Sequence, residues 1–287
     1  MTNEPGHYSY REITTQAASW KDALATVLRQ RPALEELLEA NRQREHLYIG
    51  CGSTHYLALF AAPYAQALTG RACRAAPSSE VYWQTNTLVT PGSQPLAVAL
   101  SRSGETSETI MAVNRLRERG SDALTISCYG ETGLSEASSL TVEITEGREE
   151  SFAQTRSFAG MLVASQAVAA LAAGNAALLA DLSRLPGLAA GLITRAAPLA
   201  ERIGQDEGIR RITYLGSGPL YGLANEATVK MKEMSLSLAE PYHFMEFRHG
   251  PMSLVDREHL VVALLSEGMR DYELGVLDDL RERGARL

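Results

Sequence analysis

The stretch from Ser101 to Thr109, "SRSGETSET", follows the apolar run 95–100 ("PLAVAL") and leads into 110–120 ("IMAVNRLRERG"). A short apolar run followed by a hydroxyl-rich turn around one glycine predicts a strand and a tight loop. The segment after the loop has apolar residues at helical spacing and ends in glycine, which predicts a helix. This strand, loop and helix together indicate one unit of an α/β fold.

The hydroxyl groups of this loop can serve either a ligand or the helix itself. The first turn of a helix has unpaired backbone N–H groups and partial positive charge, and glycine lets a ligand approach the backbone closely. Ser101, Ser103, Thr106 and Ser107 can add donors, which together would form a metal-free cradle for a phosphate monoester. Alternatively, Ser103 or Thr106 is an ordinary N-cap. The pattern GxxxxGK[ST] is absent, which argues against a nucleoside triphosphate loop.

The same alternation of apolar runs and helical segments continues along the chain. It predicts doubly wound, mainly parallel sheets flanked by helices. The predicted strands cover 46–51, 96–100, 123–128, 140–144, 211–216 and 260–266, and helices cover 220–238 and 270–284. A long helical region after residue 155 is expected to be interrupted around 184–191 ("RLPGLAAG").

Two Gly-x-Gly turns indicate two similar domains. The segments "LYIGCGSTHYLALFAAPY" and "TYLGSGPLYGLANEATVK" align, and each reads as a strand, a Gly-x-Gly turn and a helix. We therefore predict a helical leader (1–34), a first domain (35–180) and a second domain (195–287) that is truncated at its C-terminal end. As dinucleotide fingerprints both turns are weak, since His55 stands where that fingerprint needs glycine.

Composition limits the possible functions. The 287 residues are 45% hydrophobic, and the net charge of −7 argues against nucleic acid as the main partner. The N-terminal segment is neither a signal nor a transit peptide, and the longest apolar stretch, 161–180, reads as a buried helix and its continuation. We therefore expect a cytoplasmic protein with three free cysteines and no membrane contact. No His/Cys/Asp cluster has metal-ligand spacing, so neither a catalytic metal nor a cofactor is expected.

The second half carries candidate acid–base groups. Lys230 and Glu233 lie three residues apart on the predicted helix, a spacing that fits a surface ion pair as well as a catalytic pair. His249 precedes Gly-Pro, a rigid turn that can present an imidazole to a cleft, although lone histidines are usually structural. The polar segment 149–158 ("EESFAQTRSF") can line a pocket before a helix.

Taken in order and spacing, these segments resemble the double SIS (sugar isomerase) domain family. The resemblance rests on "GCGSTHYLALF", "LSRSGETSET", "SFAQTRSF", "YLGSGPLYGLANEATVKMKEMS" and "AEPYHFMEFRHGP". It runs from about residue 10 to the end, and it is strongest toward the isomerase half of glucosamine-6-phosphate synthase and toward stand-alone amino-sugar-phosphate deaminases or isomerases. The resemblance implies two SIS domains.

The resemblance also implies a role for individual residues. Glu233 would be the isomerising base, Lys230 its support, and His249 the ring-opening group, which in the family reaches the pocket of the partner subunit and so implies a homodimer. Gln154 stands where the synthase has a serine. The implied substrate-binding residues are Gly52, Ser53, Thr54, Ser101, Arg102, Ser103, Thr106, Phe152 and Gln154.

The implied activity is that of an amino-sugar or hexose 6-phosphate isomerase or deaminase, in which a glutamate moves a proton between C1 and C2. The chain starts without the synthase's glutamine-hydrolysing domain, which argues against glutamine-dependent synthesis, and ends before the family's C-terminal tail lysine. A non-catalytic sugar-phosphate sensor is the alternative, although the presence of both Glu233 and His249 favours catalysis. Deglycation of a sugar-amine 6-phosphate would use the same pocket.

Overall fold

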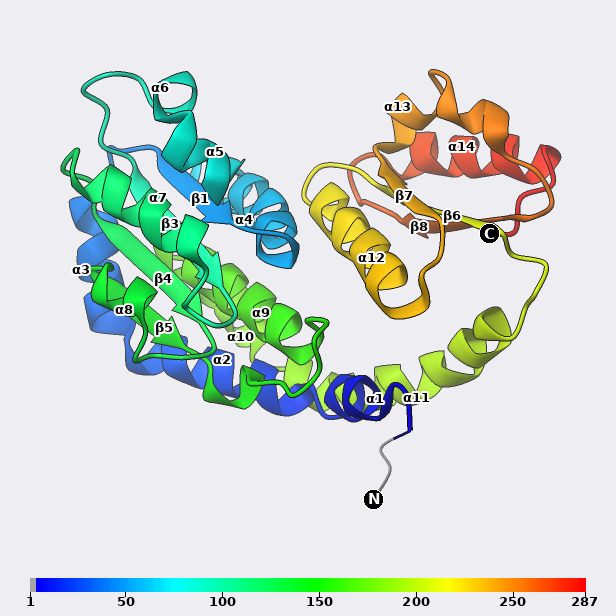
Figure 1. Ribbon diagram of the computed structural model, residues 1–287, viewed down its shortest axis with the longest axis horizontal. Coiled ribbons are helices and arrows are strands. Elements are labelled where there is room, and N and C mark those ends of the chain that lie inside the picture. The colour runs from blue at the N-terminus through cyan, green and yellow to red at the C-terminus, as the bar shows by residue number, and fades with distance from the viewer. Residues whose placement is uncertain (1–3) are drawn as a thin grey trace. The chain divides into compact units, whose positions relative to one another are not determined.

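In the computed structural model, which describes residues 4–287, the chain folds into two units, Met1–Ile193 and Thr194–Leu287 (Figure 1). The first three residues of the predicted leader lie outside the described part. Each unit contains a parallel sheet flanked by helices, which confirms the predicted fold class.

The sheet of the first unit has five parallel strands in the order β2-β1-β3-β4-β5. Because β2 and β3 lie on opposite sides of β1, the strand order reverses between β1 and β3. The strands are β1 (His46–Gly50), β2 (Cys73–Pro77), β3 (Leu96–Ser101), β4 (Ala123–Ser127) and β5 (Leu140–Glu143).

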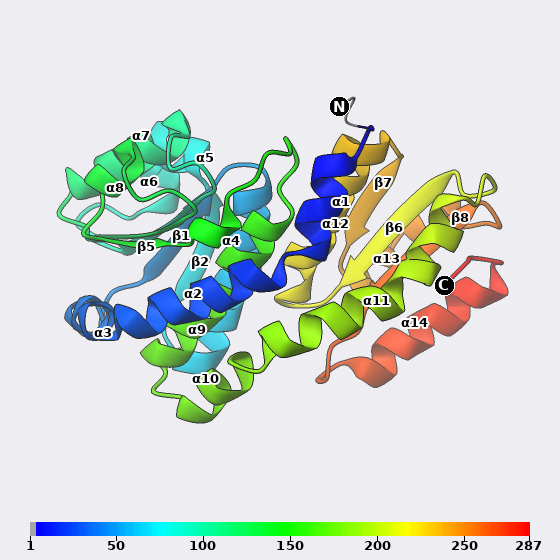
Figure 2. The same cartoon turned by 90° about the horizontal axis from the view of Figure 1, so that it is seen from below.

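Helices cover both faces of this sheet (Figures 1 and 2). One face carries α2 (Ala17–Arg29), α3 (Arg31–Ala40), α4 (Ser53–Thr69) and α9 (Arg156–Ala172). The other carries α5 (Ser78–Trp83), α7 (Ser107–Arg117) and α8 (Gly133–Glu136), whose apolar side chains pack with β1 and β3. The remaining helices of the unit are α1 (His7–Thr14), α6 (Thr85–Leu88), the 3-10 helix η1 (Thr145–Gly147) and α10 (Ala176–Leu182).

The leader helix α2 packs closely on α9. Ser19 Oγ donates to the carbonyl of Arg156 at 3.1 Å, and a Cβ at Gly160 would collide with that hydroxyl. Only glycine therefore allows the two helices this approach.

The sheet of the second unit has three parallel strands in the order β7-β6-β8. The helix α12 packs on one face, while α13 and α14 pack on the other around Phe244 and Phe247, which are both fully buried. The elements are α11 (Leu185–Gly204), which leads in from the first unit, β6 (Arg211–Gly216), α12 (Leu220–Ser235), β7 (Ala239–Tyr242), α13 (Phe244–Phe247), the 3-10 helix η2 (Pro251–Leu254), β8 (His259–Leu264) and α14 (Arg270–Glu282).

The two Gly-x-Gly turns have the same backbone. A Cβ at Gly50 would lie 2.6 Å from the Thr54 backbone, and one at Gly216 would lie 2.5 Å from the Leu220 carbonyl oxygen. The second glycines, Gly52 and Gly218, have φ values of 56° and 54°. Both turns thus need glycine for the same two reasons: a tight strand-to-helix contact and a left-handed φ.

Several predicted boundaries differ from the structure. The interruption expected around 184–191 is found at 183–184 and is shorter than predicted, because α11 begins at Leu185 and runs through the rest of that stretch, with Pro186 tolerated at its second position. A further break, which was not predicted, lies at 173–175. The helix predicted to reach 238 ends at Ser235, since Leu236 adopts a left-handed φ of 53°.

The apolar stretch 161–180 forms the largely buried α9 and, after a turn, the start of α10. Within the described residues no single helix has the length and apolar character to cross a membrane, whereas α10 and α11 pass that test only as a pair bent by 44°.

Candidate active site

The loops that follow β1 and β3 lie side by side at the carboxyl edge of the first sheet. The two strands pair in parallel register, with Ile49 opposite Ala99, so both end at the same level. In a doubly wound sheet, ligands bind beyond the carboxyl ends of the strands where the strand order reverses, which here is between β1 and β3. The topology therefore brings the hydroxyl-rich loop and the first Gly-x-Gly turn together at the carboxyl edge of the sheet, where the strand order reverses.

The hydroxyl-rich loop folds around the buried Ser101. Its Oγ accepts from the Gly104 N–H at 3.1 Å and lies 3.4 Å from Thr106 Oγ1. Ser103 Oγ accepts from the Glu105 N–H at 3.2 Å. Gly104 has a φ of 69°, and a Cβ there would collide with Thr132. The loop is thus held by its own serines, with Gly104 allowing contact with the start of α8.

Thr106 occupies the N-cap position of α7 without capping it. Its backbone is extended, with φ −67° and ψ 113°, and its side chain accepts no hydrogen bond from the helix. The first turn of α7 therefore keeps N–H groups that another acceptor can bind. Of the two roles considered for this loop, side-chain capping by Thr106 is therefore not seen in the structure.

The first Gly-x-Gly turn uses its threonine internally. Thr54 is buried, its Oγ1 donates to the Cys51 carbonyl at 2.9 Å and it accepts from the Cys51 N–H at 3.0 Å. Ser53 is buried beside it, whereas Gly52 is exposed. The hydroxyl of Thr54 thus holds the turn together, and Gly52 brings exposed backbone to the crevice.

A row of three hydrogen-bonding side chains, which was not predicted from the sequence, joins three elements at this edge. Cys51 Sγ lies 3.6 Å from Thr109 Oγ1, which lies 3.1 Å from the fully buried Ser78 Oγ. These residues come from the β1 turn, α7 and the start of α5. These contacts hold α7 in a fixed orientation relative to β1. No local sequence pattern indicates them.

Arg102 connects the hydroxyl loop to the predicted pocket segment 149–158. Its Nη1 donates to the Phe152 carbonyl at 2.9 Å and lies 3.9 Å from Glu149 Oε2. Phe152 is 88% exposed, so it contributes its backbone carbonyl rather than its ring to the contact. Gln154 is half-buried, and its Oε1 has no hydrogen-bond partner.

Glu149 organises that segment, a role that no local sequence pattern indicates. Its side chain is fully buried and accepts from the Thr155 N–H and Oγ1, both at 2.6 Å, and from Ser157 Oγ. A carboxylate at the start of α9 also complements the helix dipole. Glu149 thereby fixes both the start of α9 and the position of the loop that meets Arg102.

A cavity of about 730 Å³ opens beside the hydroxyl loop, at the carboxyl ends of β3, β4 and β5. Of the sequence-predicted residues, it contains Arg102 and Ser103. Four carboxylates and two guanidinium groups lie in its wall. Its lining residues are Arg102, Ser103, Glu105, Tyr129, Gly130, Glu131, Thr132, Glu143, Arg148 and Glu149.

In the second unit, Lys230 lies between two carboxylates of α12. Its Nζ is 3.2 Å from Glu226 Oε1 and 2.7 Å from Glu233 Oε2. The ion pair predicted from the spacing is thus present. The Lys230 side chain is 18% exposed and that of Glu233 35%, so the glutamate is only partly shielded from water in this chain.

His249 is exposed and follows α13 directly, at the carboxyl end of β7. The start of α12 lies at this same edge, since Tyr221 stacks on His243 with ring centroids 3.8 Å apart. Glu233 is twelve residues further along α12 than Tyr221, about 18 Å at the rise of an α-helix. Glu233 therefore lies toward the end of α12 that is remote from His243.

Among residues 4–287, no three His, Cys, Asp or Glu side chains cluster closely enough to hold a metal ion. The first unit supplies backbone N–H groups, hydroxyls and the guanidinium of Arg102, and the second unit supplies Lys230, Glu233 and His249. Such a set can bind an anion and move protons.

Comparison with known proteins identifies the family. The sequence pattern of the SIS domain matches residues 41–171 and 208–287. The chain belongs to the SIS domain family. D-galactosamine-6-phosphate deaminase AgaS of Escherichia coli is 28% identical over 291 residues, covering 96% of this chain and 75% of that protein.

Two further relatives extend the comparison. Glutamine–fructose-6-phosphate aminotransferase (isomerizing) of Thermus thermophilus is 30% identical and matches 98% of this chain, which spans only 48% of that protein. Among solved structures, tagatose-6-phosphate ketose/aldose isomerase from Escherichia coli superposes with a TM-score of 0.89 at 25% identity, covering 99% of this chain and 82% of that one.

Proposed function

We propose that this SIS protein is a sugar-phosphate isomerase or deaminase whose substrate is an amino-sugar or hexose 6-phosphate. The observation that carries the proposal is the uncapped, hydroxyl-rich start of α7 at the β1–β3 crevice. The relatives support an enzyme of this class, since they include a galactosamine-6-phosphate deaminase and a ketose/aldose isomerase.

The phosphate is assigned to the loop from Ser101 to Thr106. The free N–H groups at the start of α7 and the hydroxyls of Ser103 and Thr106 supply the donors, and the helix dipole favours the dianion. Arg102 holds the 149–158 segment next to the loop through the Phe152 carbonyl. Anchoring at the phosphate positions the sugar carbons for proton transfer.

Proton transfer is assigned to Glu233, and ring opening to His249. Glu233 removes a proton from C2 of the open-chain sugar and returns it to C1, while Lys230 stabilises the carboxylate and the developing negative charge. Where C2 carries an amine, the resulting enolamine is reprotonated at C1 to an imine. Water then adds to the imine carbon, and the C–N bond breaks to release ammonia and a ketose phosphate.

We also propose a homodimer in which His249 serves the site of the partner subunit. The support is that Glu233 lies toward the end of α12 remote from His243, and that no contact between Glu233 and His249 is seen within the described residues. A symmetric dimer supplies each site with both groups. A cytoplasmic location remains a prediction from the sequence.

The test is an assay of the purified chain with galactosamine 6-phosphate, glucosamine 6-phosphate and tagatose 6-phosphate. Release of ammonia together with a ketose phosphate would identify a deaminase, and aldose–ketose interconversion without ammonia would identify an isomerase. Binding without turnover, unchanged in Glu233→Gln, would instead indicate a sugar-phosphate sensor and would refute the enzymatic proposal.

A further inference from the structure

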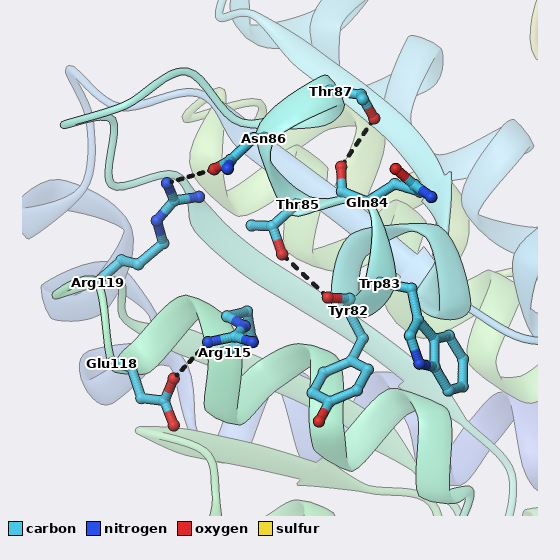
Figure 3. A pocket seen from close by; sticks show the side chains of 9 residues that line it. All are labelled: Tyr82, Trp83, Gln84, Thr85, Asn86, Thr87, Arg115, Glu118 and Arg119. Atoms are coloured by element: carbon cyan, nitrogen blue, oxygen red, sulfur yellow. Dashed lines mark hydrogen bonds and ion pairs between the residues drawn. The ribbon is translucent and has the colours of Figure 1, made fainter.

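A second cavity lies on the outer helical layer of the first unit, away from the carboxyl edge of the sheet. Its volume is about 540 Å³, which is within the range of small-molecule sites. It is formed by the segment 82–87, at the end of α5 and in α6, and by the last turn of α7 (Figure 3). The hydroxyl loop lies at the opposite end of α7, about 16 Å away along the helix.

Arg119 brings an uncompensated positive charge to this cavity. Its Nη2 donates to Asn86 Oδ1 at 3.0 Å, while its Nη1 is buried and has no hydrogen-bond partner. Across the described residues, no carboxylate forms an ion pair with Arg119. A partly buried guanidinium without a carboxylate partner is costly, and an anion in the cavity would compensate its charge.

Arg115 and the two aromatic residues add flat surfaces. The Arg115 guanidinium lies over the Tyr82 ring at 5.6 Å, and Tyr82 meets Trp83 edge to face at 5.2 Å. Arg115 is already paired with Glu118 at 3.2 Å, so it contributes little free charge. Trp83 is 61% exposed and offers an indole surface on which a planar ring can stack.

Neutral amides complete the wall. The Asn86 carboxamide is oriented by Arg119 through its oxygen, which leaves its NH₂ group as a donor. Gln84 is exposed beside it, and its side chain has no hydrogen-bond partner within residues 4–287. Figure 3 shows Asn86 joined to Arg119 at one side of the cavity, with Gln84 and Trp83 at the other side.

We propose that this cavity binds a nucleoside monophosphate. The phosphate pairs with Arg119, the base stacks on Trp83, and the carboxamides of Gln84 and Asn86 hydrogen-bond to the base or ribose. Base stacking on an aromatic side chain adds affinity that a phosphate ester without a planar ring lacks. The site is independent of the proposed sugar-phosphate site.

Because the chain has only two tryptophans, Trp20 and Trp83, the variant Trp20→Phe reports on Trp83 alone. Its fluorescence is titrated with adenosine 5′-monophosphate, uridine 5′-monophosphate, inorganic phosphate and glucose 6-phosphate. We expect saturable quenching by at least one of the nucleotides, and a dissociation constant at least tenfold higher for inorganic phosphate and for glucose 6-phosphate.

Adding Arg119→Ala should raise the nucleotide dissociation constant at least tenfold. Arg42→Ala, which removes an exposed arginine of the same unit, and Ser103→Ala, in the hydroxyl loop, should leave it unchanged. Calorimetry on Trp83→Ala, which removes the stacking surface, checks the stacking without fluorescence and should show a loss of nucleotide affinity. Absence of saturation by both nucleotides, equal affinity for glucose 6-phosphate, or unchanged affinity in Arg119→Ala would each overturn the proposal.

Discussion

At the scale of single residues, Glu233 is the side chain on which the proposed chemistry depends. Glu233→Gln keeps its size and removes the base, so we expect kcat to fall at least 10²-fold while binding of the sugar phosphate persists. The measurement is steady-state turnover together with calorimetric binding. Glu282→Gln, an exposed glutamate of α14, is the control and should keep full activity. Wild-type turnover in Glu233→Gln would exclude the assigned base.

Substitutions in the hydroxyl loop should change KM rather than kcat. Ser103→Ala and Thr106→Ala each remove one donor to a charged phosphate, worth roughly 1.5–3 kcal/mol, so KM should rise about 10- to 100-fold in each. Ser183→Ala removes an exposed hydroxyl at the end of α10 and should change nothing. If both loop variants kept the wild-type KM, the phosphate would have to bind elsewhere.

His46 predicts a pH dependence of stability. It is buried at the start of β1, and burial, assisted by the charge of Arg71, lowers its pKa from 6.5 to about 4. Between pH 6.5 and pH 4 the unfolded chain binds a proton at His46 while the folded chain does not. The free energy of unfolding is therefore unaffected by His46 above pH 6.5 and decreases as the pH falls toward 4. Between pH 7 and pH 5 the loss is about 2 kcal/mol.

Urea unfolding at both pH values measures this effect. In His46→Gln, the difference in the free energy of unfolding between pH 7 and pH 5 should shrink by about 2 kcal/mol. An unchanged difference would mean that His46 does not titrate as its burial implies.

The positions of some site residues were predictable from the sequence, whereas their hydrogen bonds were not. The positions of Ser101, Ser103 and Thr106 in a strand-to-helix loop were predictable, because strand, glycine turn and helix each have a local pattern. The internal hydrogen bonds of Thr54 were not, since they depend on how one turn closes. The substrate-binding roles assigned to these residues remain predictions.

At the scale of elements, the strands predicted from apolar runs form, and the two that were missed are edge strands. Strand β2 ("CRAAP") and strand β7 ("AEPY") each contain a proline and a charged residue, and each pairs on one side only. Proline and charge are tolerated there because an edge strand leaves half of its hydrogen-bonding groups unpaired. Their pattern therefore does not distinguish them from loops.

The cysteines test the arrangement of the elements at the carboxyl edge. Burial raises the pKa of Cys73 to about 11 and that of Cys128 to about 12, so both should resist alkylation at neutral pH. Cys51 is only half-buried and lies in the turn after β1. We expect iodoacetamide to modify Cys51 first, and a bound sugar phosphate to slow the reaction several-fold. Mass spectrometry that found Cys73 or Cys128 modified before Cys51 would contradict this arrangement.

At the scale of the whole molecule, we propose that the two units are copies of one fold. The support is that the β1–α4 and β6–α12 turns share their glycine geometry, and that β2-β1-β3 and β7-β6-β8 have the same order. The finer boundaries, a leader to 34 and domains at 35–180 and 195–287, remain predictions. A repeat can be recognised in the sequence because each copy has the same local pattern. Contacts between residues that are distant in the sequence, or in different subunits, have no such local pattern.

The proposed homodimer predicts complementation between inactive variants. Glu233→Gln and His249→Ala should each be inactive alone, but hybrid dimers contain one site with both groups intact. Random mixing after mild dissociation should therefore restore roughly a quarter of the wild-type activity. No recovery in a mixture shown to contain hybrid dimers would place both groups in the same subunit's site.

The most direct test of the central claim is a crystal structure of the chain with a bound hexose 6-phosphate. We expect the phosphate between β1 and β3, with oxygens about 3 Å from the N–H groups and hydroxyls of the loop from Ser101 to Thr106. A phosphate held in the cavity beside β4 and β5, or anywhere out of reach of that loop, would contradict it.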